Sequence, residues 1–386
     1  MVAGTTPVFG VCEDRFAALG KVFQRAIVDN SDVDDRELGA CVSAVVNGKT
    51  VVDLWGGYLD QDRTMPWQRD TTVCVFSVTK AVAAFCIHVL HDRKVIDIDA
   101  PIAAYWPEFG QHGKEGITIR MVLSHQAGLL YTDDIAEGAL WQSGAIERVL
   151  EAKSPEWGPG TAGGYHSFTF GPLIEAVVKR ATGRTLGQLL RNDITGPLGL
   201  EFGIGLSDAE NLCCSDFFTN EENGTINAFR HDKDSAVYRC WKALPRTESF
   251  NSEQWRKREF SSLNGHGNAR SLARIFFCLA NNGEIGGIRM LSSAHVDDIS
   301  RPQWEGTDRF SEQPGRFNSG FQMSNELYPF GGRRDNYGFY GIGGSMAFCD
   351  PVNKLSFAYC RNNCIAGPAA ENPVSLALVK ALYESL

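Results

Sequence analysis

The sequence contains no long hydrophobic run. The longest apolar stretch, residues 81–90, is interrupted by His88, whereas a membrane-spanning helix needs about 20 apolar residues. The N-terminal stretch also lacks a basic segment, because Glu13 and Asp14 precede the first arginine, Arg15. A secretory signal begins with positive charge. We therefore predict a cytoplasmic protein with no signal peptide and no membrane partner.

Basic residues are too few for a nucleic-acid-binding protein. Lysine and arginine number 37 against 46 aspartates and glutamates, which gives a formal net charge of −9. Proteins that follow a phosphate backbone carry an excess of positive charge. The composition therefore excludes nucleic acid as an expected partner.

Cysteines are present, but not in the pairs that hold metals or build small disulfide scaffolds. The eleven cysteines are an odd number and none forms a Cys-x-x-Cys pair. We predict reduced thiols in a cytoplasm-like compartment. The alternatives are a metal site and a disulfide framework, of which the second suits short secreted chains.

Several motifs of enzyme chemistry are also missing. The sequence has no Gly-x-Ser-x-Gly elbow, no phosphate-binding Walker loop and no His-Glu-x-x-His. These absences argue against an α/β-hydrolase, a nucleotide-binding enzyme and a zinc protease.

The composition that remains is typical of a large globular protein. Hydrophobic residues make up 43% and charged residues 22% of 386 residues, which excludes disorder as the main state. At about 150 residues per domain, the length corresponds to roughly 2.6 domains. We expect two modules, or one large domain with an insertion.

Hydrophobic periodicity predicts strands near both ends and helices between them. An apolar face every three to four residues indicates helices, and β-rich runs, two of them joined by Asn47-Gly48, indicate strands. Helices are expected at 14–28, 80–90, 118–123, 145–152, 171–181, 186–194, 269–281 and 373–386, and strands at 40–46, 50–57, 320–323, 344–350 and 354–361. Residues 208–262 are polar and aperiodic, so we expect a long excursion or lid there. This order indicates an α/β domain formed from both chain ends, with a helical insertion.

One tetrapeptide has the arrangement of an activated serine. Ser77-Val78-Thr79-Lys80 stands where a β-like run at 72–76 meets a helix. Residues three apart share a helix face, so the Ser77 hydroxyl and the Lys80 amine lie within reach of each other. The positive end of the helix favours a developing alkoxide, and a neighbouring base makes the hydroxyl nucleophilic.

The base must be neutral, and burial among apolar neighbours lowers a lysine pKa in that direction. Alone, however, Ser-x-x-Lys arises by chance about once in a chain of this length. The alternative is a serine that caps the helix beside a solvated lysine.

Further segments around this tetrapeptide strengthen the first interpretation. They follow in order along nearly the whole chain, at residues 75–80, 97–101, 105–108, 117–129, 159–161, 165, 182–184, 197–200, 264–274 and 343–351. Together they resemble the serine β-lactamase and penicillin-binding superfamily. Within it the sequence is most similar to the family VIII carboxylesterases, which themselves resemble class C β-lactamases.

The resemblance implies a mainly antiparallel sheet flanked by helices and an active site at a domain interface. The α/β domain would comprise residues 1–80 and 185–386, and the mainly helical domain residues 81–184. It also implies that Ser77 is the nucleophile and Lys80 its proton acceptor. Tyr165, in the place of the family's Tyr-x-Asn motif, would be a second general acid or base, and a base if its phenol is ionised. The alternative for Tyr165 is a core residue.

The chain departs from the β-lactamase pattern at two places. Ser167 replaces the asparagine that contacts the acylamide chain of β-lactams, and Phe339-Tyr340-Gly341 replaces the Lys-Thr-Gly motif. The lysine missing there recognises the β-lactam carboxylate. The same strand would still supply the backbone N–H of Ile342, which with that of Ser77 forms the expected oxyanion hole.

A pocket beside these motifs would hold an apolar group. Its expected lining is Ser167, Trp157, Phe339, Tyr340 and Gly341, although core packing explains the aromatic residues equally well.

Three histidines have structural explanations. We interpret His125 and His266 as histidines with satisfied hydrogen bonds, and His166 as an exposed spacer.

These observations predict a serine carboxylesterase that hydrolyses small, short-chain esters through an acyl-enzyme and needs no cofactor and no metal. The ester is the expected partner, and the sequence leaves the oligomeric state open. One alternative is an amidase, D-aminopeptidase or weak β-lactamase with the same residues. The other is a non-catalytic scaffold of the same fold.

Overall fold

The structure is a computed structural model that describes residues 7–28 and 37–386. No helix in these two ranges is long and apolar enough to cross a membrane. Residues 1–6, at the start of the stretch from which we predict the absence of a signal peptide, lie outside the described residues.

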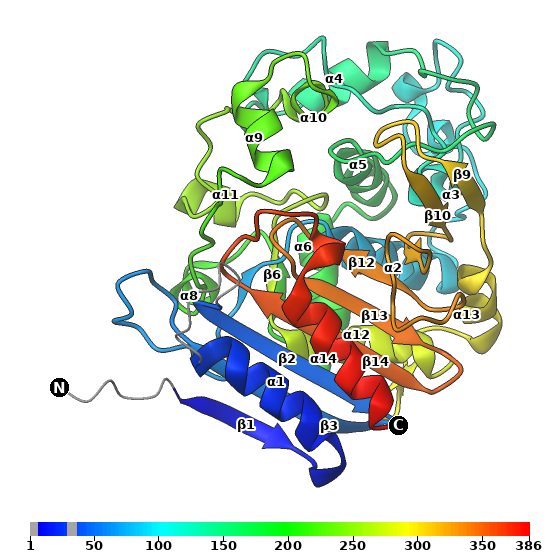
Figure 1. Cartoon of the computed structure of the whole chain (residues 1–386). Coiled ribbons are helices and arrows are strands. Elements are labelled where there is room, and N and C mark those ends of the chain that lie inside the picture. The colour runs from blue at the N-terminus through cyan, green and yellow to red at the C-terminus, as the bar shows by residue number, and fades with distance from the viewer. Residues whose placement is uncertain (1–6, 29–36) are drawn as a thin grey trace.

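Nine strands of the described chain form one antiparallel sheet. Their order is β1 (Val8–Cys12), β3 (Lys49–Gly57), β2 (Gly39–Val46), β14 (Leu355–Arg361), β13 (Met346–Asp350), β12 (Tyr337–Tyr340), β11 (Gln322–Met323), β10 (Pro314–Phe317) and β9 (Trp304–Thr307). Strands from the two chain ends meet where β2 pairs with β14, with Cys41 opposite Cys360 (Figure 1). The predicted α/β fold, with its antiparallel sheet formed from both ends of the chain, is confirmed.

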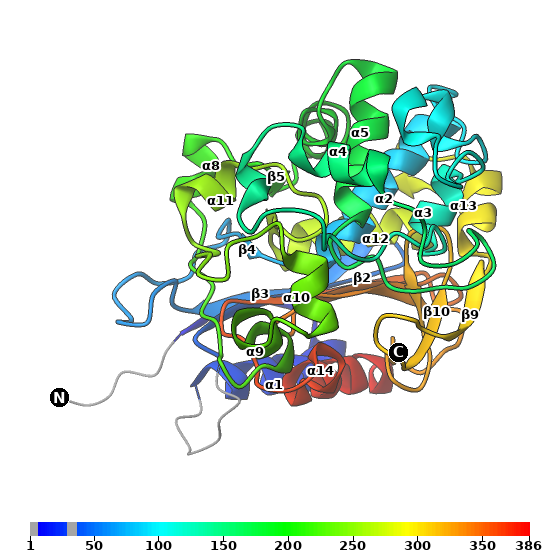
Figure 2. The same ribbon diagram turned by 90° about the horizontal axis from the view of Figure 1, so that it is seen from above.

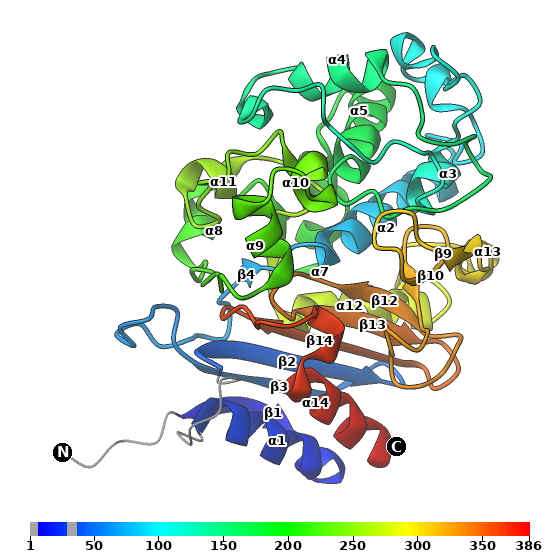
Figure 3. The same cartoon turned by 45° about the horizontal axis from the view of Figure 1, so that its top comes forward.

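The hairpin predicted at Asn47-Gly48 is also present. Both residues have positive φ, 51° and 82°, as the tight turn between β2 and β3 requires. β2 is buried on both faces because helices cover both sides of the sheet. Figures 2 and 3 show α1 (Ala17–Val28) and α14 (Pro373–Glu384) on one face and α12 (Ala269–Ala280) on the other.

The remaining elements lie mostly on the α12 side of the sheet. They are η1 (Asp14–Phe16), α2 (Val78–Asp92), η2 (Ile102–Ala104), η3 (Pro107–Phe109), α3 (Ile119–Leu123), η4 (Ala139–Trp141), α4 (Ala145–Ala152), α5 (Phe170–Thr182), α6 (Leu186–Leu190), η5 (Arg191–Thr195), α7 (Gly196–Leu198), α8 (Asp208–Leu212), α9 (Gly224–His231), α10 (Ala236–Trp241), α11 (Glu253–Lys257), α13 (Ser293–Ser300), η6 (Ala369–Glu371), and the short strands β4 (Val73–Cys74), β5 (Phe202–Ile204), β6 (Gly265–Gly267), β7 (Glu284–Ile285) and β8 (Ile288–Arg289). The predicted domain boundaries near residues 80 and 184 stay predictions.

Helix α2 is the central helix of the molecule. All of its residues from Val78 to Leu90 are buried, since α5, α6 and β12 pack around it. A helix that is apolar on every side belongs in a core. Its N-terminus, which follows Ser77, is thereby held in a fixed place.

The segment 208–262 differs from the irregular excursion that we expected. It contains four short helices, α8 to α11. The side chains of Ser207, Asn223, Ser235 and Ser252 each accept a hydrogen bond from the first turn of the helix that follows. These caps stabilise helices too short to show a clear period.

Candidate active site

Ser77 lies at a strained turn between β4 and α2. The preceding residue, Phe76, has a φ of +44°, which is rare for a side chain of its size. The Phe76 ring is clamped by Phe217 and Phe250, with centroids 4.7 and 5.1 Å away. The Ser77 side chain makes no capping bond to the helix, so its hydroxyl stays available on the cavity side.

Lys80 lies one turn further along α2, fully buried. Its Nζ is 3.3 Å from Oγ of Ser77 and donates a 2.8 Å hydrogen bond to the carbonyl of Ser262. Burial lowers the pKa of Lys80 well below its usual value, because a charged amine loses its hydration there. The amine is therefore suited to accept the proton of Ser77.

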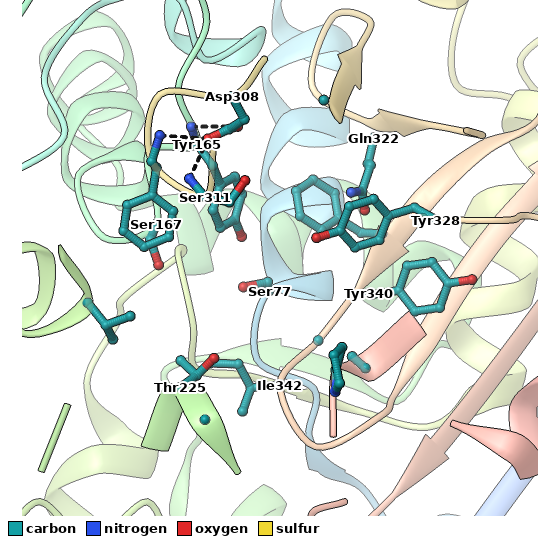
Figure 4. A pocket seen from close by; sticks show the side chains of 18 of the residues that line it. Ser77, Tyr165, Ser167, Thr225, Asp308, Ser311, Gln322, Tyr328, Tyr340 and Ile342 are labelled. Atoms are coloured by element: carbon teal, nitrogen blue, oxygen red, sulfur yellow. Dashed lines mark hydrogen bonds between the residues drawn. The ribbon is translucent and has the colours of Figure 1, made fainter. Parts of the chain in front are cut away.

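Tyr165 completes a group of three side chains. Its ring centroid is 4.9 Å from Nζ of Lys80, and Figure 4 shows its hydroxyl directed toward Ser77. Burial raises the pKa of Tyr165, although hydrogen bonding to Ser77 acts in the opposite direction. The phenol is consequently neutral at neutral pH, and the group is suited to donate a proton before it accepts one.

Asp308, a residue that the sequence did not suggest, holds Tyr165 in position. It lies after β9, is 3% exposed, and its Oδ2 accepts a 3.0 Å hydrogen bond from the backbone N–H of Tyr165. Its Oδ1 accepts from the N–H groups of Phe310 and Ser311 at 2.8 and 3.0 Å. The carboxylate joins the β9–β10 hairpin to the Tyr165 loop. No local pattern marks such a residue in the sequence, because its contact with Tyr165 spans 143 residues.

The backbone near Ile342 approaches Ser77 closely. A β-carbon at Gly341 would lie 2.1 Å from the carbonyl oxygen of Val75 and 3.5 Å from the amide nitrogen of Ser77. Only glycine allows this approach. In the described part of the chain, neither the N–H of Ser77 nor that of Ile342 donates to a protein acceptor, so both are free for an oxygen of a ligand.

These groups surround a cavity of about 400 Å³. Its lining is Ser77, Tyr165, Ser167, Asn223, Gly224, Thr225, Val237, Asp308, Phe310, Ser311, Pro314, Gly315, Phe317, Gln322, Tyr328, Phe339, Tyr340, Gly341, Ile342, Ala366, Gly367, Pro368 and Ala369. Four of the five pocket residues expected from the sequence are present: Ser167, Phe339, Tyr340 and Gly341. The lining residues that the sequence did not suggest come largely from α9, from α10 and from the segment β9–β11.

Trp157 is the exception among the expected pocket residues. Its indole N–H donates to the carbonyl of Ala162 at 2.9 Å, and its ring packs beneath Gly164 and against His166. This inward packing keeps it away from the cavity lining.

The exposed position expected for His166 is wrong. The ring is fully buried, its Nε2 accepts from the N–H of Leu129 at 3.1 Å, and its Nδ1 bonds the carbonyl of Gly164 at 2.7 Å. Two backbone groups thus hold it in place. Burial lowers its pKa to about 4, so His166 is a neutral structural residue.

The other two histidines are also buried. Nδ1 of His125 accepts a 3.1 Å hydrogen bond from the N–H of His166, and the His125 ring lies 4.9 Å from that of Tyr165. Its pKa is lowered well below the usual value by burial. His266 lies in β6, where burial lowers its pKa to about 3. Both rings are therefore neutral.

The described residues do not include a cluster of three or more His, Cys, Asp or Glu side chains that could hold a metal ion. The cavity brings together a serine, a buried amine, a phenol and two backbone amides.

Known proteins share this fold. Residues 23–364 match the family described as beta-lactamase. The chain belongs to the beta-lactamase family. The esterase/beta-lactamase LipL of Mycobacterium tuberculosis is 31% identical over 373 residues, which cover 93% of this chain and 84% of LipL.

Two solved structures are similar over almost the whole length of this family member. A penicillin-binding protein homologue from Caulobacter crescentus is 36% identical with a TM-score of 0.87, covering 99% of this chain and 100% of that one. A family VIII carboxylesterase is 31% identical with a TM-score of 0.88, covering 98% and 100%. The family resemblance predicted from the sequence is confirmed, and the chain is a hydrolase of the serine beta-lactamase and esterase superfamily.

Proposed function

We propose that the chain is a serine carboxylesterase that hydrolyses small, short-chain esters through a covalent acyl-enzyme. The observation that carries the proposal is the buried amine of Lys80, 3.3 Å from the Ser77 hydroxyl and with its pKa lowered by burial, beside a cavity of about 400 Å³. A neutral amine at that distance is the base that a serine nucleophile requires.

In the acylation step, Lys80 takes the proton of Ser77 while Oγ forms a bond to the ester carbonyl carbon. The N–H groups of Ser77 and Ile342 stabilise the negative oxygen that develops. Tyr165 gives its proton to the alcohol oxygen as the carbon–oxygen bond breaks. The acyl-enzyme then stands beside a lysine ammonium and a tyrosinate.

Water releases the acid in the second step. The tyrosinate of Tyr165 takes a proton from water, whose oxygen attacks the acyl carbon. The ammonium of Lys80 returns its proton to Oγ of Ser77 as that atom leaves. Both side chains end as they began, so the cycle needs no cofactor.

The charge of the cavity favours neutral esters over anionic β-lactams. Among the described residues, its lining contains no lysine or arginine, and its charged residue is the acidic Asp308. The third motif, Phe339-Tyr340-Gly341, has no cation either. A carboxylate in this cavity would have no ionic partner, which makes its burial costly.

The test is hydrolysis of p-nitrophenyl esters with acyl chains from C2 to C12 by the wild type and Ser77→Ala, with nitrocefin and D-amino-acid amides alongside. We expect turnover of the short esters that Ser77→Ala abolishes. Faster hydrolysis of nitrocefin or of the amides would favour a β-lactamase or an amidase. The name of LipL joins esterase with beta-lactamase, which keeps the β-lactamase alternative in view. Failure of a fluorophosphonate probe to label Ser77 would favour a non-catalytic scaffold.

We also propose that the protein resides in a reducing, cytoplasm-like compartment. Of its eleven cysteines, nine are buried as free thiols, Cys12 is partly buried and Cys213 is exposed. Thiol titration of the denatured, unreduced protein should find eleven free thiols. A smaller number would contradict this proposal.

A further inference from the structure

Two polar side chains in the cavity wall stand without partners. Gln322 is 7% exposed, and neither its carboxamide nor the hydroxyl of Tyr328 forms a hydrogen bond with any residue in the described ranges. Figure 4 shows both groups directed into the cavity. Neither group is among the buried polar atoms that lack a partner, so both are reached from the cavity and are available to hydrogen-bond a ligand.

Gln322 cannot turn outward to satisfy itself. Its strand, β11, lies between β10 and β12, with Gln322 paired to Phe317 on one side and to Gly338 on the other. The pleat of the sheet therefore fixes the face on which the side chain stands. The sheet presents this carboxamide to the cavity.

Tyr328 is likewise held by packing. Its ring centroid lies 5.9 Å from that of Tyr340. The two tyrosines differ in their hydroxyls, because that of Tyr340 donates to the carbonyl of Pro329 at 2.9 Å. Asn223 also lines the cavity but directs its amide to the carbonyl of Ile365 at 3.0 Å. The side chains of Gln322 and Tyr328 have no such hydrogen-bond partner in the described part of the chain.

The positions of Gln322 and Tyr328 indicate which half of the ester these side chains contact. The hydroxyl of Tyr165 must reach the alcohol oxygen, and Tyr328 is directed to the same side of Ser77 as that hydroxyl (Figure 4). Ile342, whose N–H donates a hydrogen bond to the carbonyl oxygen, lies on the opposite side of Ser77. Gln322 and Tyr328 thus line the space beyond the leaving oxygen.

We infer that Gln322 and Tyr328 form a subsite for the alcohol half of the ester, selecting neutral groups that both donate and accept hydrogen bonds, such as a hydroxyl or a carboxamide. This inference rests on the proposed esterase function. Both side chains can donate and accept hydrogen bonds. A substrate group that can only donate, or only accept, would therefore leave a donor or acceptor atom of these side chains unpaired. With Asp308 as the charged residue of the cavity lining, an anionic alcohol group would be disfavoured.

The experiment compares three butyrate esters that share one acyl chain. They carry a propyl, a 2,3-dihydroxypropyl or a carboxymethyl alcohol group. For the wild type we expect kcat/KM on the dihydroxypropyl ester to exceed that on the propyl ester by about five- to tenfold, the effect of one or two neutral hydrogen bonds. The carboxymethyl ester should be the poorest of the three.

Two variants test the residues themselves. Gln322→Leu replaces the carboxamide with an apolar group of similar size, and Tyr328→Phe removes only the hydroxyl. Each should reduce the ratio of the two kcat/KM values toward one. Thr225→Val, which removes a hydroxyl from another part of the cavity wall, is the matched control and should leave the ratio as in the wild type.

The outcomes separate this inference from the proposed function. Equal turnover of the propyl and dihydroxypropyl esters by the wild type would overturn the subsite and leave the esterase standing. A preference that survives both substitutions would also overturn it. If no ester is hydrolysed, the proposed function fails and the subsite with it. Should Gln322→Leu not fold, Gln322→Met and Tyr328→Phe decide the question.

Discussion

Nζ of Lys80 lies 3.3 Å from Oγ of Ser77 in a place that water does not reach. Its other hydrogen bond goes to a neutral carbonyl, that of Ser262, and no carboxylate of the described chain pairs with it. The uncharged amine is therefore favoured by burial alone. This amine should support activity and lower the stability of the fold.

Replacing Lys80 with methionine should abolish activity and stabilise the fold. Methionine fills a similar volume without a buried amine, so kcat on short esters should fall by about 10²- to 10⁴-fold. The pKa of Lys80 is lower in the folded than in the unfolded state, so the wild type loses stability as pH falls below the unfolded value of about 10.4. Thermal unfolding at pH 9 and pH 6 should show Lys80→Met gaining most at pH 6. An equal gain at both pH values would contradict a lowered pKa.

Replacing Tyr165 with phenylalanine should affect esters according to their leaving group. The phenol donates a proton to the alcohol oxygen, which an alkoxide needs and a p-nitrophenolate does not. We expect kcat to fall by about 10²-fold or more on ethyl butyrate and much less in the acylation burst with p-nitrophenyl butyrate. Equal losses on both substrates would indicate that Tyr165 acts only by packing.

Gly341→Ala should impair the oxyanion site specifically. The new methyl group would lie 2.1 Å from the carbonyl oxygen of Val75, so the backbone beside Ile342 must move away from Ser77. A lost oxyanion donor costs about 10²- to 10³-fold in kcat. Gly367→Ala is the matched control, because Gly367 also lines the cavity and a β-carbon there meets nothing within 4 Å. Similar kinetics for the two variants would refute the close approach.

Acid should destabilise the protein through its buried histidines. Burial lowers the pKa of His88 to about 3, of His166 to about 4 and of His266 to about 3. The unfolded chain binds these protons near pH 6.5, so stability falls as pH drops from about 6.5 toward 4, by about 1.4 kcal/mol per pH unit for each histidine. Denaturant unfolding at pH 7, 6 and 5 measures this slope. His88→Gln should reduce this slope, and an unchanged slope in that variant would contradict the prediction.

Local sequence patterns predicted the parts of the fold that local forces determine. The helices α2, α4, α5 and α12 occupy almost the expected residues, because α2 is a long apolar run and the other three combine an apolar period with a sharp end. Periodicity did not reveal β12, since its four buried residues show no alternation; only the family resemblance placed a strand at residues 339–341. The capping residues Ser207 and Asn223 could have predicted short helices in the segment 208–262.

The residues of the site also fall into two groups, those that local sequence patterns identify and those that they do not. Ser77 and Lys80 come from one helical turn and could be recognised together, and the ordered family motifs added Tyr165. Asp308 is 143 residues from Tyr165 in sequence, and Gln322 reaches the cavity through strand pairing alone. Such contacts depend on the folded topology, which one sequence without relatives does not reveal.

The burial of α2 along thirteen consecutive residues, 78–90, has a consequence for how the protein loses its activity. Backbone amides in such a helix exchange with solvent deuterium only when the surrounding core opens. Ser77, which directly precedes this helix, and Lys80 within it should therefore belong to the last cooperative unit to unfold. Catalytic turnover should persist through fraying of the chain ends and disappear in the same denaturant range as the tertiary structure.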